Sequence, residues 1–298
     1  LVYFSIMIYR EKSQKVELIG NYIEHVEQSA TISELIAELS RERRYSYFYI
    51  LKDSVYSQIL PHRIKTDSIM RILNKSKDLA LKNYTKYTFL DNLYFMHATI
   101  DSSKTNTNLV IQYYTDAIFR LNTLASEIPG NPFLKPVYRD LIAQRTLAQM
   151  ITYFGIIRTN VFNVLFTRKY MLETLYGTLG VYKVYKTYET EFLLKASPSA
   201  VSKYDNVKKI TDLKMSNTYL DSLFTTFKFD SAFDANRWWN VSTNSMIALR
   251  KQQRALWKSV DTRMKEIYQQ ENNSKNETLL FLLLAIALVT FFVSYIVM

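Results

Sequence analysis

LIAQRTLAQMITYFGIIRTNVF, residues 141–162, decides the fold class because its apolar residues recur at spacings of three and four. Leu147, Ile151 and Phe154 fall on one face of an α-helix, and Val161 continues that face. Similar spacing recurs along the chain in segments of roughly 20 to 35 residues. Only five Gly and five Pro occur in the whole chain, fewer than a strand-and-turn fold requires. The sequence predicts an all-α body of about eight antiparallel helices.

Clusters of turn-forming residues mark the expected helix ends. Residues 31–34 (TISE) predict a helix start, because a Thr or Ser with Glu shortly after it is typical of an N-cap. A polar loop is expected at 100–108, and three of the five prolines lie in the strongest divider, 128–136 (IPGNPFLKP). Further turns are expected at 195–200 (KASPSA) and 228–236 (KFDSAFDAN).

The C-terminal stretch LLFLLLAIALVTFFVSYIVM, residues 279–298, carries no charged side chain. At about 1.5 Å per residue it extends roughly 30 Å, the thickness of a bilayer's hydrocarbon core. We therefore expect a transmembrane helix over residues 277–298. No Pro or Gly interrupts the chain after Leu249, so this helix is expected to continue from the body into the membrane with little or no break, as a mechanical link.

The opposite end, LVYFSIMIY at residues 1–9, is also apolar and meets charge abruptly at Arg10. Nine residues are too few to span a membrane, so we expect them to be the end of a first transmembrane helix. Residues 10–276 then form an extracytoplasmic domain between two membrane helices, with halves of about 10–130 and 131–276. On this interpretation the chain is a piece of a longer protein.

The composition narrows the function classes. The net charge of +11 arises without a dense Lys/Arg run or a nucleic-acid-binding motif, so we expect no nucleic-acid partner. A solvated Lys-rich surface and the steering of small anions both explain the charge. His25, His62 and His97 lack metal-ligand spacing, Cys is absent, and no catalytic motif occurs. We therefore expect no metal, no cofactor and no enzymatic activity. Glu34 and Glu38 are interpreted as surface salt links beside an Arg-rich turn.

Two arginines occupy positions where a helical stripe calls for an apolar residue. Arg43 follows Ile32, Ile36 and Leu39 on one stripe, whereas Arg158 follows Phe154 on the other. Guanidinium stays protonated under ordinary conditions, and a charge buried without partners is costly. Each arginine therefore has either an intramolecular partner, a route to the rim, or an anion shared with the other arginine.

Four motifs in order resemble the NIT (nitrate- and nitrite-sensing) domain family. LIAELSRERRYS (35–46) is similar to its L-x-x-E-L-Q-x-E-R-G-x-S, and LPHRIKTD (60–67) to its Q-R-x-x-T-D element. Residues 141–162 resemble its second core helix, and the segment that begins with WWNVST (238–243) its late W-x-x-A-x-T motif. The resemblance covers roughly residues 30–270. The chain departs from the pattern at Ser40 and Arg44, where the family has Gln and Gly, and Arg44 adds bulk and charge beside the site.

The resemblance implies two antiparallel four-helix bundles with long shared helices, flanked by transmembrane helices. It also implies binding of nitrate or nitrite by Arg43 and Arg158, with Ser46 and Asn160 as weaker hydrogen-bonding candidates. NIT domains occur in methyl-accepting chemotaxis proteins and sensor histidine kinases, so we expect a homodimeric receptor in the inner membrane with a periplasmic sensing domain and an output module beyond residue 298. Two alternatives stay open: a tail-anchored helical tethering protein, and a NIT-like sensor for another small ligand.

Overall fold

The computed structural model describes residues 2–51, 55–75, 88–125, 134–230 and 233–298. Nine helices and no strand occupy this described part, which confirms the predicted all-α class. The helices are α1 (Val2–Ile50), α2 (Tyr56–Lys75), α3 (Thr88–Asp101), α4 (Thr107–Ala125), α5 (Tyr138–Thr167), α6 (Leu172–Lys195), α7 (Pro198–Lys208), α8 (Thr211–Thr226) and α9 (Ala235–Val297).

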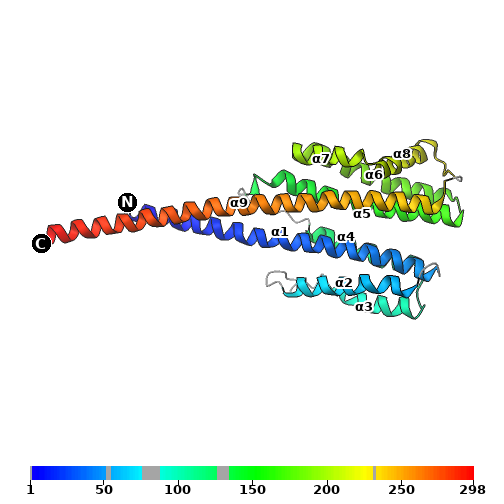
Figure 1. Ribbon diagram of the computed structural model, residues 1–298, viewed down its shortest axis with the longest axis horizontal. Coiled ribbons are helices and arrows are strands. Elements are labelled where there is room, and N and C mark those ends of the chain that lie inside the picture. The colour runs from blue at the N-terminus through cyan, green and yellow to red at the C-terminus, as the bar shows by residue number, and fades with distance from the viewer. Residues whose placement is uncertain (1, 52–54, 76–87, 126–133, 231–232) are drawn as a thin grey trace.

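The helices form two bundles on either side of a spine made by α1 and α9, which run side by side in Figure 1. In the first bundle α1 packs with α2, α3 and α4 around an aliphatic core that includes Leu39 and Leu93. In the second bundle α5, α6, α8 and α9 surround an aromatic core that includes Phe154 and Trp238. The described helices therefore have two separate cores, and the predicted boundary between the two halves of the chain stays a prediction.

Most predicted breaks coincide with helix ends. Residues 102–106 separate α3 from α4, and the predicted divider lies between α4 and α5, although its residues 128–133 are outside the described residues. Ser197 caps α7 by accepting a hydrogen bond from the Ala200 amide at 3.2 Å, with Pro198 at the first helical position. Asp234 caps α9 in the same way.

The predicted helix start at residues 31–34 is wrong, because α1 continues through it without interruption. The Thr31 hydroxyl donates to the Glu27 carbonyl at 2.9 Å, and the Ser33 hydroxyl donates to the Ser29 carbonyl at 2.9 Å. Both side chains therefore bond back to the preceding turn instead of capping a new helix. Long-range packing of α1 against α9 outweighs the local capping preference.

Beyond the bundles, toward the two ends of the chain, α1 and α9 form an antiparallel two-helix stalk (Figure 1). Its apolar contacts include Ile19 and Met264, and the Lys15 ammonium lies 2.6 Å from the Glu271 carboxylate. Beyond the start of α1, α9 continues alone to its end in Figure 1. Within the described residues, α9 is the one helix with a window long and apolar enough to cross a membrane, and 6% of that window is buried. A first membrane helix ending at residue 9 stays a prediction.

Candidate functional site

Arg43 of α1 and Arg158 of α5 are both buried, each with 5% of its surface exposed. Arg43 Nη1 donates to Thr115 Oγ1 at 2.8 Å, and Arg158 Nη1 approaches Thr243 Oγ1 at 3.2 Å. The second terminal nitrogen of Arg43, Nη2, lies against Gly155, which precedes Arg158 by one turn of α5. The structure therefore brings the two arginines, which are more than a hundred residues apart in sequence, to the same α1–α5 contact.

Two further arginines join them. Arg250 of α9 is partly buried, and its Nη2 donates to Ser40 Oγ at 3.0 Å. Arg44 and Arg158 both lie over the Trp239 ring, at 5.3 Å and 4.3 Å from the guanidinium carbon to the ring centroid. These contacts are cation–π interactions, which stabilise a guanidinium without neutralising it.

None of these four guanidinium groups forms an ion pair with a carboxylate among the described residues. The nearby acids are engaged elsewhere: Glu38 with Arg41, His62 and Lys65, and Glu34 with Arg254. The Nε atoms of Arg44 and Arg158 are buried and have no hydrogen-bond partner in the described structure. The cluster is therefore a buried concentration of positive charge with donor capacity to spare.

The electrostatic consequence is a set of lowered pKa values. Burial lowers the pKa of Arg43 to about 10, and burial followed by the charge of Arg41 lowers that of Arg250 to about 10. The pKa of Arg158 is also lowered, first through burial and then through repulsion by Arg43, Arg44 and Arg250. The ligand-free site therefore holds like charges in a poorly solvated interior, which an anion would relieve.

A polar pocket of about 170 Å³ lies at the centre of this cluster. Arg44, Arg158 and Arg250 line it, together with Arg41 and Thr243. Arg43 is not part of the lining, but it lies against Gly155 as does Met246, which lines the pocket. Arg158 is thus the predicted ligand residue in the pocket, whereas Arg43 adjoins it from the α1–α4 side.

The other two predicted site residues face elsewhere. Ser46 is fully buried on the face of α1 that carries Glu42, one turn away, and it neighbours Tyr114 of α4. Asn160 is partly buried and follows Arg158 by two residues, so it projects about 200° around α5. Neither residue lines the pocket.

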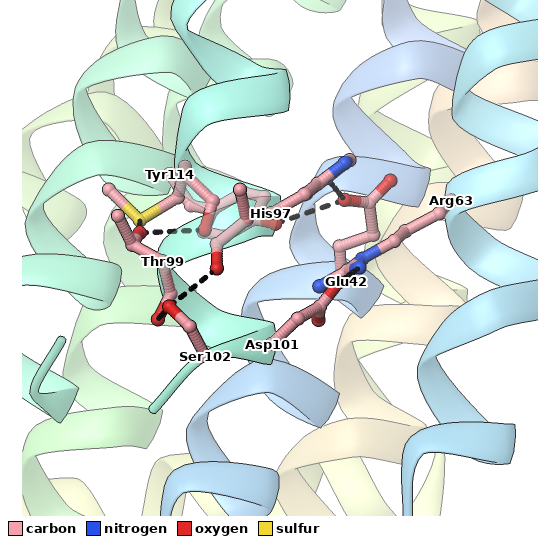
Figure 2. Close-up of polar contacts among 9 residues, drawn as sticks. Glu42, Arg63, His97, Thr99, Asp101, Ser102 and Tyr114 are labelled. Atoms are coloured by element: carbon pink, nitrogen blue, oxygen red, sulfur yellow. Dashed lines mark hydrogen bonds and ion pairs between the residues drawn. The ribbon is translucent and has the colours of Figure 1, made fainter. Parts of the chain in front are cut away.

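A second polar cluster fills the interior of the first bundle, beside Arg43. Figure 2 shows Glu42 approached by His97 and Tyr114, at 2.9 Å and 3.0 Å from its Oε2. Arg63, the arginine of the 60–67 element, pairs with Asp101 at 2.8 Å. Glu42 therefore binds polar groups of α3 and α4, whereas the adjacent Arg43 joins the two bundles, because it bonds Thr115 of α4 and lies against Gly155 of α5.

The interpretation of Glu38 as a surface salt link is wrong. Its side chain is fully buried and accepts contacts from Arg41, His62 and Lys65. The hydrogen bonds and positive charges of these partners lower its pKa despite the opposing effect of burial. Within the described residues, no group of three or more His, Asp or Glu side chains is placed to hold a metal ion.

Sequence reasoning missed Arg250 as a site residue. Arg250 directly follows the buried Leu249 on α9, so its stripe position alone predicts a flanking surface residue. Its location in the site depends on α9 lying against Ser40 of α1. The one sequence feature that pointed to Arg250 was its position seven residues after the 238–243 motif. Trp238 of this motif lies at the site, because its indole donates to the Arg158 carbonyl at 3.0 Å.

The described residues form an all-helical domain with a cationic pocket between its two bundles. The family profile described as nitrate and nitrite sensing (NIT) matches residues 34–261. The chain therefore belongs to the NIT family.

The comparisons of whole chains support the fold. The structure of the NasR transcription antiterminator is similar, with a TM-score of 0.64 and 12% sequence identity over 92% of this chain and 82% of that chain. At this identity the likeness shows the shared fold. A comparison with the curated proteins finds no match.

Proposed function

We propose that this chain is the extracytoplasmic sensing region of a membrane receptor, and that it binds nitrate or nitrite in the pocket between its two bundles. The observation that carries the proposal is the convergence of Arg44, Arg158 and Arg250 on one small pocket without a carboxylate partner among the described residues. A planar oxyanion matches the guanidinium fork, which donates two parallel hydrogen bonds.

The residue roles differ with distance from the pocket. Arg158 and Arg250 line it from α5 and α9 and act as direct ligands. Arg43 does not line the pocket and attracts the anion through its positive charge, which also lowers the pKa of Arg158. Ser46 and Asn160 remain candidates through rearrangement only, because both lie away from the lining in this structure.

Signalling would follow when the bound anion relieves the repulsion between the clustered arginine side chains. An anion held by α5 and α9 draws these helices together beside α1, and α9 continues without a break toward the C-terminal apolar segment. A ligand that prefers one arrangement about a hundredfold supplies about 2.7 kcal/mol, enough to reset a nearly balanced pair of states. In a homodimeric receptor of the inner membrane, such a shift of α9 would reach an output module beyond residue 298.

Calorimetry on the full chain in lipid nanodiscs tests the proposal. Nitrate and nitrite are expected to bind, Arg158→Ala and Arg250→Ala to weaken binding at least tenfold, and Arg43→Ala to weaken it less. Arg71→Ala is the matched control, because Arg71 is exposed on α2 and its loss changes the net charge equally. Equal nitrate affinity in the parent, Arg158→Ala and Arg250→Ala, with unchanged helical circular dichroism, would remove the proposal.

A further inference from the structure

A larger and mostly apolar pocket adjoins the anion pocket. It has a volume of about 560 Å³ and lies between α1, α2 and α9. The two pockets share two lining residues, Ala37 and Arg250. Volumes of several hundred Å³ are typical of sites for small organic molecules, and this one far exceeds the space that nitrate requires.

The wall of this pocket suits an apolar body. Val26 and Ala30 of α1, Ile69 and Ile72 of α2, and Trp257 of α9 form its apolar lining. The Trp257 indole nitrogen donates to Ser33 Oγ at 3.0 Å, so the polar atom of this side chain is satisfied inside the protein. Trp257 is 6% exposed and packs in the core between α1 and α9, so a small part of its apolar surface faces the pocket. Ile72 is 58% exposed, so its side chain is accessible to a ligand in the pocket.

The charges around the pocket leave a positive excess. Glu27 and Asp261 both contact Lys265, at 2.8 Å and 2.9 Å, and Glu34 contacts Arg254 at 3.5 Å. Lys65 is paired with Glu38 at 2.8 Å.

Arg250 and Lys258 also line the pocket, and within the described part of the chain neither forms an ion pair with a carboxylate. Arg250 stands at the boundary with the anion pocket, and Lys258 lies on the exposed side of α9.

We propose that this second pocket binds an organic carboxylate with a compact apolar body. The body lies against Trp257, Ile69 and Ile72. The carboxylate is attracted by the positive charges of Arg250 and Lys258, which lie about 12 Å apart along α9. A neutral apolar molecule would leave the two cations without a counter-charge. A small inorganic anion would leave the apolar wall uncovered. The site goes beyond the nitrate site, and it requires of that site only the shared Arg250.

Three probes, tested on the full chain in nanodiscs, separate the contribution of the carboxylate charge from that of the apolar body. The first is 3-phenylpropionate, the second is the neutral 3-phenylpropionamide, and the third is propionate, which keeps the charge without the ring. Calorimetry is expected to give an affinity for 3-phenylpropionate at least about tenfold higher than for either of the others. Equal affinity for the acid and the amide, or no binding of the acid, would overturn the proposal.

Site variants locate the binding. Ile72→Asn and Lys258→Gln change exposed side chains, so both are expected to fold. Each should weaken 3-phenylpropionate binding by about threefold to tenfold and leave nitrate binding within about twofold of the parent. Binding of 3-phenylpropionate beside Trp257 is expected to change the tryptophan fluorescence of the parent protein. This change should be absent in Trp257→Phe, whereas the fluorescence of Trp238 and Trp239 should still change when nitrate binds. Unchanged 3-phenylpropionate binding in both Ile72→Asn and Lys258→Gln contradicts the assignment.

The two proposals fail separately. Nitrate binding without 3-phenylpropionate binding rejects the second pocket alone, and the reverse pattern rejects the nitrate site alone. Arg250→Gln is expected to weaken both ligands, because the two pockets share this side chain. Loss of nitrate binding with undiminished 3-phenylpropionate binding in Arg250→Gln would contradict the role given to Arg250.

Discussion

Gly155 lies directly against the guanidinium group of Arg43. A Cβ atom built at residue 155 would be 3.2 Å from Arg43 Nη2 and 3.4 Å from Met246 Cε. The absence of a side chain on α5 therefore leaves the space that the α1 arginine fills. Because Arg158 follows one turn later on α5, this glycine sets how closely two of the clustered positive charges approach each other.

Gly155→Ala is expected to disturb the site more than the fold. The new methyl group pushes the Arg43 guanidinium by a few tenths of an ångström, and the better helix propensity of Ala offsets part of the strain. Nitrate affinity measured by calorimetry should fall by about twofold to threefold, no more than in Arg43→Ala, because Arg43 acts on the anion through its charge and not through a direct hydrogen bond. Gly180→Ala is the matched control, because its Cβ meets nothing within 4 Å, and it should gain about 0.5 to 1 kcal/mol of stability with unchanged affinity. Equal affinities in the two variants would contradict the role of Gly155.

Arg158→Met is expected to stabilise the ligand-free protein while abolishing nitrate binding. The substitution removes a buried cation that is repelled by Arg43, Arg44 and Arg250 and keeps an apolar side chain over the Trp239 ring. Replacing buried charges by apolar groups is neutral or stabilising by about 1 to 4 kcal/mol in known cases. Thermal unfolding followed by circular dichroism should show a higher midpoint without ligand. A lower midpoint would mean that the Thr243 and Trp239 contacts outweigh the repulsion.

Glu42→Leu is expected to destabilise the first bundle by about 3 kcal/mol, because it leaves polar groups of His97 and Tyr114 buried without their partner. Glu42→Gln keeps an acceptor of the same size and should be less damaging. Denaturant unfolding measures the free energy of unfolding of both variants. Glu266→Leu, on an exposed carboxylate of α9, serves as the control and should change stability by less than about 0.5 kcal/mol. Similar losses in Glu42→Leu and Glu266→Leu would refute the importance of the buried network.

The protein is expected to lose stability as pH rises above about 10. Burial raises the pKa of Tyr219, so the unfolded chain releases this proton near pH 10 while the folded chain retains it. Folding stability then falls by about 1.4 kcal/mol per pH unit for each such group, because the native state binds more protons.

Tyr219→Phe tests this pH dependence. The Tyr219 hydroxyl is buried without a hydrogen-bond partner in the described structure, so the variant should match the parent near pH 7. Between pH 10 and 11.5 its stability in urea should fall less steeply. The lowered pKa values of Arg43 and Arg250 act in the opposite direction but equally in both proteins, so they cancel in the comparison. Parallel curves for the two proteins would show that Tyr219 ionises normally.

The burial of two arginines was predictable from single helices, whereas their part in a ligand site stays a prediction. Arg43 and Arg158 interrupt apolar stripes, and both prove to be buried. The stripe argument works because a side chain's helical face follows from the period of the helix. The interpretation of Glu38 from charge spacing within α1 was wrong, because its pairing with His62 and Lys65 depends on α2, a neighbouring helix that this spacing does not specify.

The sequence by itself determined the helical class, the apolar C-terminal helix and the burial of two arginines, because periodicity and hydropathy act within one segment. Tertiary structure alone decided that α1 passes unbroken through Thr31 and that Arg250 joins Arg158 in one pocket. These outcomes depend on which faces of distant helices meet. A helical pattern states that a face is buried, but the packing free energy summed over several helices selects its partner.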